Sequence, residues 1–175
     1  NAFTGPGYKG NPAGICVVDE WPASGVMQNI AAENNLSETA FVVRREEYYD
    51  IRWFTPEKEV DLCGHATLGT AYVITHFVEP DVESIEFHSN SGKLFVTRMG
   101  ESYRMDFPVR VPEPVLPPEH LSKILGVEPA ETFLSRDLFV VLESEEQVRG
   151  LRPDLKAMKT LHMGEGVIVT AQGKD

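Results

Sequence analysis

Two short segments of the chain combine the residue types that proton-transfer chemistry needs. Residues 35–42 place a carboxylate, Glu38, at the start of an apolar strand. Residues 61–67 place the thiol of Cys63 and the imidazole of His65 at the opening of a helix without charged residues. A carboxylate in water is a poor base, but beside a hydrophobic wall its pKa rises toward the range in which it can both take and return a proton. Together the two segments predict a proton-transfer site.

Glu38 is the predicted general base. Its carboxylate would remove a proton from an activated carbon of a small acid and deliver it elsewhere, an isomerisation that can proceed without a metal or an organic cofactor. The alternative is that Ser37 and Glu38 only cap or pair near a strand start, which spacing alone favours because most glutamates are solvated. Strand parity does not decide, since Glu38 shares a face with Ala40 and Val42 while the other face is equally apolar.

The helix opening at Gly64 predicts a site for an anion. Gly64, His65 and Ala66 would expose unpaired backbone N–H groups where the helix dipole is positive, which favours a carboxylate or a developing enolate oxygen. His65 could donate a hydrogen bond to the substrate or shuttle its proton. Cys63 at this terminus would have a lowered pKa and could itself act as a base. Against this, a lone cysteine is usually a small buried hydrophobe, and a single histidine near a helix start often only caps it.

Other polar residues near these segments have weaker signals. Asp61 could orient His65 or serve as an ordinary N-terminal cap of the helix. The remaining histidines have no companions at catalytic or metal-binding spacing, so we expect structural roles for them and no metal site (His76, His88, His120 and His162).

Composition restricts the class of protein and of partner. With 42% hydrophobic and 25% charged residues and no low-complexity tract, the 175 residues fit neither a disordered nor a fibrous protein. The net charge of -11 argues against a nucleic-acid or anionic-membrane partner, because either would repel the average surface. Cys16 and Cys63 frame no disulfide scaffold, so a cytoplasmic location is expected. The longest uncharged run, residues 62–78, is too short for a membrane span.

The elements that must position the site follow from periodicity and turn residues. Residues 64–77 predict a helix without a charged side, and such a helix must lie inside other structure. We expect the predicted strands to surround this helix. The pattern predicts a Gly/Pro-rich loop over residues 5–12, which could approach a ligand or only join two strands. After this loop it predicts a strand at 14–18, a helix at 24–34, a hairpin of strands 38–45 and 49–54, and strands 84–88, 93–98 and 102–107.

Five prolines within residues 108–118 predict a linker between subdomains. After it the pattern predicts helices at 119–125 and 145–150 and strands at 132–135, 138–142 and 166–171. The roughly 57 residues that follow the linker make a marginal core. We therefore expect that a partner half is missing.

Four motifs occur in order along about the first 110 residues: GNPAG at residues 10–14, NLSETAFV at 35–42, RWFTP at 52–56 and DLCGHATLG at 61–69. In this combination the chain resembles the amino-terminal half of the PhzF-like isomerase family of phenazine biosynthesis. The resemblance implies an α/β (α+β) fold of the diaminopimelate-epimerase type. That fold has two similar halves, each a curved mixed sheet or barrel around a central buried helix, with the active site in the cleft between them.

The resemblance also implies roles for individual residues. Glu38 would be the general acid/base and His65 would assist it, without a cofactor, while the Gly64 end of the helix would hold the substrate. Cys63, Asp61 and Asn11 would be further substrate-binding residues. In the name-giving members the substrate is a hydroxylated dihydro-anthranilate, an amino-bearing cyclic acid, and family likeness implies a homodimer. In the related epimerases a cysteine beside the central helix is a base, but those enzymes need a second cysteine from the other half, and none follows Cys63.

We therefore expect residues 1–110 to form the first epimerase-like half, with its central helix at 64–77, and residues 111–175 to form a linker and the incomplete start of a second half. Nothing after Arg110 resembles the family's acidic, Pro- and Ser-containing carboxyl-terminal segment, so we expect a longer polypeptide and doubt activity if the chain ends at Asp175. The expected function is an isomerase or epimerase acting on a small cyclic or amino carboxylic acid. Two alternatives stay open: a non-catalytic small-acid-binding or interaction protein that keeps the fold, and a cysteine-dependent amino-acid racemase using Cys63.

Overall fold

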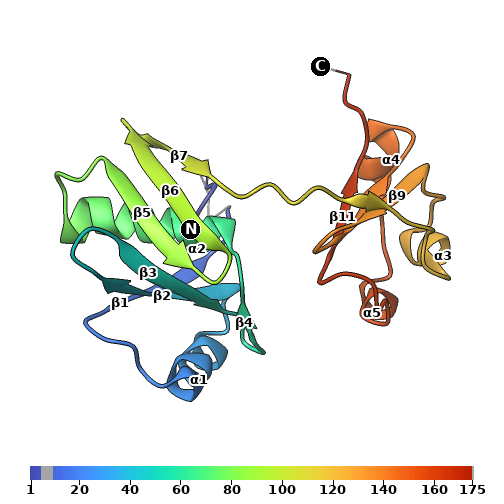
Figure 1. Ribbon diagram of the computed structural model, residues 1–175. Coiled ribbons are helices and arrows are strands. Elements are labelled where there is room, and N and C mark those ends of the chain that lie inside the picture. The colour runs from blue at the N-terminus through green and yellow to red at the C-terminus, as the bar shows by residue number, and fades with distance from the viewer. Residues whose placement is uncertain (5–9, 175) are drawn as a thin grey trace. The chain divides into compact units, whose positions relative to one another are not determined.

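The computed structural model describes residues 1–4 and 10–174, and the chain divides into two compact units, Asn1–Pro108 and Val109–Asp175 (Figure 1). Each unit has its own sheet and its own hydrophobic core. Most of the predicted Gly/Pro-rich loop, residues 5–9, lies outside the described residues. On either side of it, Ala2 and Asn11 form an antiparallel bridge with two backbone hydrogen bonds of 2.9 Å.

The first unit contains a mixed sheet of seven strands. The strand order is β1-β2-β3-β5-β6-β7, with β4 paired to β3 alone; β2 is parallel to β1 and β5 is parallel to β3, and the other pairs are antiparallel. Within the described residues β1 and β7 end this order without pairing to each other, so the sheet is open and the expected alternative of a closed barrel is wrong. The strands are β1 (Ala13–Val18), β2 (Glu38–Arg44), β3 (Tyr49–Phe54), β4 (Glu59–Val60), β5 (Ser84–Ser89), β6 (Gly92–Met99) and β7 (Ser102–Asp106).

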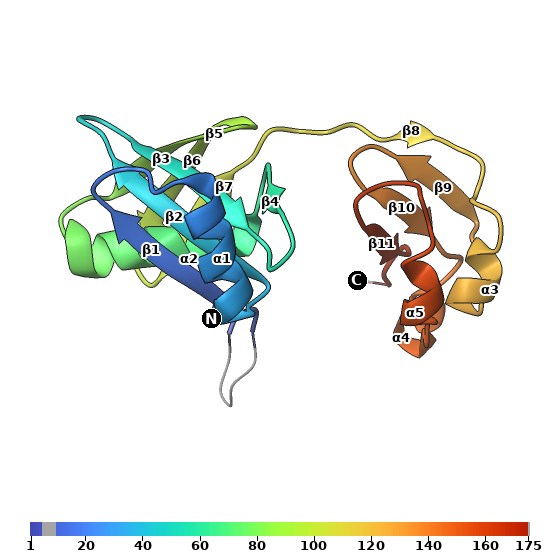
Figure 2. The ribbon, with the colours of Figure 1, turned by 90° about the horizontal axis from the view of Figure 1, so that it is seen from below.

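Two helices cover opposite faces of the part of this sheet that carries β2 (Figure 2). On one face Phe41 packs with Met27 and Ala31 of α1 (Ser24–Asn34). On the other face Ala40 belongs to the same cluster as Ala66 and Ala71 of α2 (Gly64–Val73). Because both faces are covered, β2 is apolar throughout instead of alternating, which is why its sequence pattern could not show which way Glu38 points.

Helix α2 and the turn that continues it, residues 64–78, contain no Asp, Glu, Lys or Arg, and their buried polar residues are threonines. Thr67, Thr70 and Thr75 are at most 2% exposed. Each threonine hydroxyl donates to the backbone carbonyl four residues earlier, at 2.6, 2.8 and 2.9 Å respectively. A buried hydroxyl that bonds to its own helix needs no other partner.

The predicted helix at residues 64–77 differs from the observed one in two ways. The α-helix ends at Val73 and continues as a π-helical turn, η1 (Ile74–Val78). It is also not buried on all sides, because Tyr72 and Phe77 are 47% and 75% exposed. The other residues of α2, 64–71 and Val73, are buried or half-buried.

The second unit contains a smaller sheet in the order β11-β10-β9-β8, in which only the β10–β11 pair is parallel. Its core is formed by Leu121, Leu125, Leu138, Val140 and Leu142. The unit consists of β8 (Glu113–Pro114), α3 (Leu121–Leu125), β9 (Glu131–Leu134), β10 (Leu138–Val141), α4 (Glu145–Gly150), α5 (Leu155–Met158) and β11 (Val167–Thr170).

Part of the predicted linker belongs to this second sheet. Glu113 and Pro114 pair with β9, and the next residue, Val115, donates its backbone N–H to the Thr132 carbonyl at 3.0 Å. Proline is tolerated here because β8 is an edge strand. The prediction of a linker over the whole of residues 108–118 is therefore wrong from Glu113 onward.

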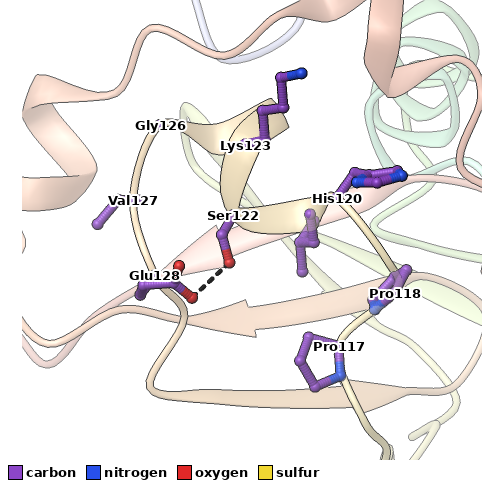
Figure 3. A pocket seen from close by; sticks show the side chains of 9 residues that line it. Pro117, Pro118, His120, Ser122, Lys123, Gly126, Val127 and Glu128 are labelled. Carbon is purple, nitrogen blue, oxygen red and sulfur yellow. Dashed lines mark hydrogen bonds between the residues drawn. The ribbon is translucent and has the colours of Figure 1, made fainter.

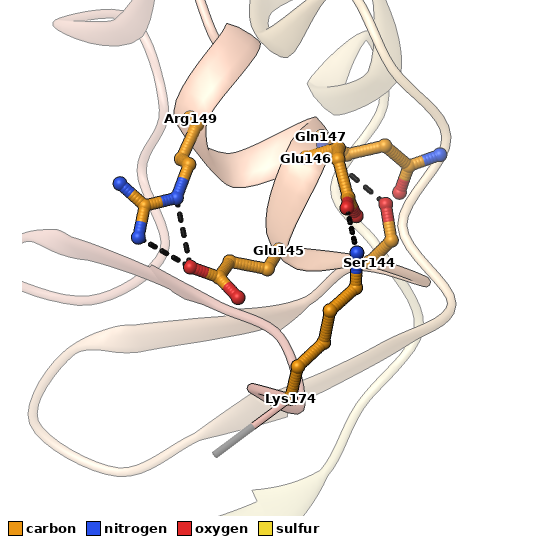
Figure 4. A network of polar contacts seen from close by, with 6 residues as sticks. All are labelled: Ser144, Glu145, Glu146, Gln147, Arg149 and Lys174. Carbon is orange, nitrogen blue, oxygen red and sulfur yellow. Dashed lines mark hydrogen bonds and ion pairs between the residues drawn. The ribbon is translucent and has the colours of Figure 1, made fainter.

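Polar contacts surround the first turn of helix α4 (Figure 4). Its N-cap, Ser144, accepts a hydrogen bond from the backbone N–H of Gln147 at 3.3 Å. Glu145 pairs with Arg149 one turn later, and Lys174 pairs with Glu146. These ion pairs are exposed and each contributes little to stability, but the second one ties the end of the described chain to α4. Across residues 1–4 and 10–174 we find no helix with the length and apolar character needed to cross a membrane.

Candidate active site

The fold brings the predicted base and the predicted imidazole into direct proximity. Glu38 is the first residue of β2, and His65 is the second residue of α2. Helix α2 packs on the face of β2 that carries Ala40. The distance from Glu38 Oε2 to His65 Nε2 is 3.2 Å, and the two side chains are 20% and 10% exposed. Two segments separated by the whole hairpin of β2 and β3 thus form one desolvated pair of titratable groups.

Neither of these facing atoms makes a well-aligned hydrogen bond. Glu38 Oε2 and His65 Nε2 are both buried and without a hydrogen-bond partner among the described residues, and the indole N–H of Trp53 is the third such side-chain group there. A buried polar atom left without a partner costs about 1–3 kcal/mol. Such atoms need an explanation in a folded protein, and a ligand that supplies the missing partner is one.

Cys63 lies on the other side of the His65 ring. It occupies the N-cap position of α2 in an extended conformation and is 7% exposed, and its side chain makes no capping hydrogen bond. Its Sγ atom is 3.4 Å from His65 Nδ1. Thr67 anchors the Cys63 carbonyl through both its backbone N–H, at 3.3 Å, and its hydroxyl, at 2.6 Å. The imidazole therefore has a thiol next to one nitrogen and a carboxylate next to the other.

The start of α2 has the features of an anion site. The first turn contains no acidic residue and no side chain caps it, so its backbone N–H groups and the positive end of the helix dipole are available to a ligand. Packing does not require glycine at position 64, because a Cβ atom added to Gly64 would touch only the Phe107 ring, at 3.7 Å. The missing side chain instead leaves the helix start accessible.

Asn11 contacts the residue before Glu38, and Asp61 precedes Cys63 by two residues. Asp61 is not the N-cap of α2, since Cys63 holds that position, so that alternative from the sequence is wrong. The Ser91 hydroxyl donates to the Asp61 backbone carbonyl at 2.8 Å and lies 3.3 Å from its carboxylate. Asn11 Oδ1 accepts a hydrogen bond from the hydroxyl of Ser37, the residue before Glu38, at 2.8 Å. These contacts fix the chain on either side of the site.

Close packing also holds the start of β2. Gly14 of β1 pairs in register with Thr39 of β2, and a Cβ atom on Gly14 would lie 3.0 Å from Thr39 Oγ1 and 3.1 Å from Asn34 Nδ2. Those two atoms are themselves hydrogen-bonded at 3.2 Å. The glycine in the GNPAG motif thus allows β1 to approach the strand that carries Glu38.

Three supporting residues were not singled out from the sequence. Thr67 has a local signal, because a threonine four residues after a helix cap can bond back to the cap carbonyl. Ser91 and Phe107 have none, since they reach Asp61 and Gly64 from the β5–β6 turn and from beyond β7. Such contacts depend on sheet topology and cannot be read from spacing along the chain.

The two cysteines lie on opposite faces of the sheet. Cys63 belongs to the core cluster between the sheet and α2, whereas Cys16 on β1 packs against the cluster beneath α1. Burial raises the pKa of the Cys16 thiol. The described residues therefore contain no pair of thiols facing one another across a common site.

The second unit has a surface hollow of a different character (Figure 3). Pro117 and Pro118 form one wall, and His120 and Lys123 of the α3 region lie on its rim. Its carboxylate, Glu128, already accepts a hydrogen bond from the Ser122 hydroxyl at 2.6 Å. This hollow lacks the unpaired buried atoms found at Glu38 and His65, so the first unit holds the candidate site.

Comparison with known proteins agrees with the motifs. The whole chain, residues 1–175, matches the family described as phenazine biosynthesis-like protein, PhzC-PhzF. The chain belongs to the PhzF-like family. Two members in Pseudomonas aeruginosa, each named an uncharacterized isomerase, are 45% and 48% identical over 99% of this chain and over 67% and 66% of their own lengths.

A solved PhzF-family structure shows the same fold. The phenazine biosynthesis protein of Enterococcus faecalis is 48% identical, with a TM-score of 0.86 over 100% of this chain and 67% of that one. The present chain thus spans about two thirds of the length of these PhzF-like relatives.

Proposed function

We propose that this protein is a PhzF-like isomerase or epimerase that moves a proton on a small cyclic or amino carboxylic acid. One observation carries the proposal: the carboxylate of Glu38 and the imidazole of His65 face each other at 3.2 Å, both nearly buried, with their facing atoms unpaired. Membership of a family whose relatives are named isomerases supports the reaction class.

In the proposed reaction the substrate carboxylate binds at the uncapped start of α2, where the dipole and the N–H groups following Cys63 stabilise its charge. Glu38 takes a proton from the adjacent activated carbon, and the electron pair moves into the conjugated acid. The protonated carboxyl of Glu38 then returns the proton to a different carbon, or to the other face of the same carbon. His65 donates a hydrogen bond to the charge that develops.

Hydrogen exchange tests this proposal. A panel of cyclic and α-amino acids is incubated with the protein in heavy water, and deuterium uptake is followed by mass spectrometry. Glu38→Gln should slow uptake by on the order of 10² to 10⁴. Glu86→Gln is the matched control, because Glu86 also lies within reach of a histidine, at 2.6 Å from His88, but is paired with Lys93 as well and belongs to a different strand, β5. Equal rates in the two variants would refute the role of Glu38.

A cysteine-dependent racemase is the second candidate, and the 3.4 Å contact between Cys63 Sγ and His65 Nδ1 favours it, because an imidazole can activate a thiol. Against it, Cys16 packs on the opposite face of the sheet and cannot act as a partner thiol. If the racemase proposal holds, Cys63→Ser should abolish exchange as fully as Glu38→Gln does. A glutamate-based isomerase should retain most of its exchange in that variant.

A small-acid-binding protein that keeps the fold without turnover is the third candidate. It would show saturable binding of an acid and no deuterium uptake with any member of the panel. We also expect a homodimer from family likeness, which sedimentation of the purified protein would check.

A further inference from the structure

We propose that Glu38, Cys63 and His65 also form a binding site for one thiophilic divalent cation such as zinc, and that the bound ion blocks proton transfer. The blocking effect rests on the proposed function, whereas binding of the ion does not. The sequence predicted no metal site, because Glu38 is far along the chain from the other two residues.

The three side chains offer the donor types that zinc prefers. Zinc is bound in proteins by thiolate sulfur, imidazole nitrogen and carboxylate oxygen, and sites that keep an open position use three protein ligands. One ligand atom from each of Glu38, Cys63 and His65 can be chosen so that all three lie within 4.8 Å of one another. Donors around a tetrahedral ion lie roughly 3.5 Å apart, so the observed spacing needs side-chain adjustment and no change of fold.

The geometry shows which adjustment is needed. Cys63 Sγ faces His65 Nδ1 at 3.4 Å, and Glu38 Oε2 faces His65 Nε2 at 3.2 Å. A single ion can bind only one of the two ring nitrogens, so either the carboxylate or the imidazole must rotate to bring three donors onto it. Cys63 is the N-cap of α2, and Thr67 holds the Cys63 backbone carbonyl. Cys63 therefore supplies the rigid ligand.

Burial and charge provide the driving force. The His65 side chain is 90% buried and its Nε2 atom is without a hydrogen-bond partner, as is Glu38 Oε2. A metal ion would satisfy both atoms. When Cys63 is a thiolate and Glu38 a carboxylate, the two negative charges balance a divalent cation, which removes the cost of burying like charges together.

The donor set also predicts selectivity among cations. Magnesium and calcium require several hard oxygen ligands, and this site offers one carboxylate with a sulfur and a nitrogen. We therefore expect that millimolar magnesium does not compete with micromolar zinc. Zinc would hold the electron pair of Glu38, so the carboxylate could no longer accept a proton from a substrate.

Competition with a chromophoric zinc chelator measures binding without any need for a substrate. The purified chain should take up one zinc ion. Cys63→Ser and Glu38→Gln should each weaken the affinity by at least about tenfold, the lower end of what losing even an outer-shell partner costs. The matched controls, Cys16→Ser and Glu86→Gln, should bind zinc like the parent protein, and circular dichroism verifies that all four variants are folded.

The outcomes separate the two proposals. No zinc uptake by the parent protein, or equal affinity in all four variants, overturns the metal site whatever the activity is. Zinc uptake together with an unchanged rate of deuterium exchange at saturating zinc overturns the blocking effect. If no acid exchanges at all, the proposed function fails, while the chelator titration still decides whether the metal site exists.

Discussion

At the scale of single residues, the His65 imidazole couples the other two functional groups. In the neutral ring one nitrogen is a donor and the other is an acceptor. The thiol of Cys63 lies next to Nδ1 and the carboxylate of Glu38 next to Nε2. The ring therefore lies between the two other groups, with one nitrogen facing each of them.

The glycine at the start of α2 gives a prediction at this scale. We expect Gly64→Ala to fold normally and to gain up to about 1 kcal/mol in stability, because its Cβ would meet only Phe107 at an ordinary distance. The new methyl group should lower the rate of deuterium exchange by about 10- to 200-fold, the range that one methylene produces in a pocket.

Gly69→Ala is the matched control for this prediction. It lies on the same helix, and its Cβ would touch only Ile15, at 3.5 Å. We expect the same gain in thermal stability and an unchanged exchange rate. If Gly64→Ala exchanges as fast as Gly69→Ala, the substrate does not approach the helix start.

Cys16 gives a prediction about pH. Because burial raises the pKa of its thiol, a higher pH than usual is needed to form the reactive thiolate. In a Cys63→Ser background, the iodoacetamide alkylation rate should reach half its maximum at a higher pH than it does for free cysteine. In urea the protein unfolds and Cys16 is no longer buried, so the midpoint should return to that of free cysteine. The same midpoint in folded and unfolded protein, measured by mass spectrometry, would contradict this.

At the scale of elements, the site depends on a strand and a helix held against each other from both sides. Strand β2 is buried between α1 and α2, so its first residue, Glu38, emerges at the edge of a dry layer. Helix α2 can be buried there because the hydroxyls of Thr67 and Thr70 bond to backbone carbonyls of their own segment. One of these bonds, from Thr67 to the Cys63 carbonyl, also fixes the residue that contacts His65.

This arrangement predicts different effects for two similar substitutions. Thr67→Val and Thr70→Val each remove one buried hydroxyl bond of the same type, so each should cost about 1 kcal/mol of stability in urea unfolding. Only Thr67→Val loosens Cys63, so only that variant should also lose zinc affinity. Equal zinc affinity in the two variants would show that this bond serves stability alone.

At the scale of the whole molecule, the chain forms two units with separate cores. We predict that they unfold independently in urea. Both tryptophans, Trp21 and Trp53, belong to the first unit, so fluorescence reports on that unit while circular dichroism reports on both.

Core truncations in each unit test this independence. Leu138→Ala should destabilise the second unit by about 2–5 kcal/mol and leave the fluorescence midpoint unchanged. Ile51→Ala should lower the fluorescence midpoint instead. A fluorescence midpoint that moves with Leu138→Ala would mean that the two units unfold as one.

Much of the first unit could be predicted because its signals are local. The predicted hairpin at 38–45 and 49–54 corresponds to β2 and β3, and the predicted helix at 24–34 corresponds to α1. The alternation along most of β3 and Asn35, which closes α1 in a left-handed conformation, are visible in the sequence. The short strands β4 and β8 were missed, because two residues carry no period and their pairing depends on a neighbouring strand.

The amino-acid sequence by itself determined which groups could do chemistry here, a glutamate before an apolar strand and a thiol and imidazole before an apolar helix. Only the tertiary structure decided that these groups meet, that Tyr72 of α2 stays exposed, and that the two cysteines lie on opposite faces. The physical reason is that β2 is buried on both faces. Its sequence therefore lacks the alternation that would reveal side-chain direction, and the direction of Glu38 follows from packing between elements distant in the chain.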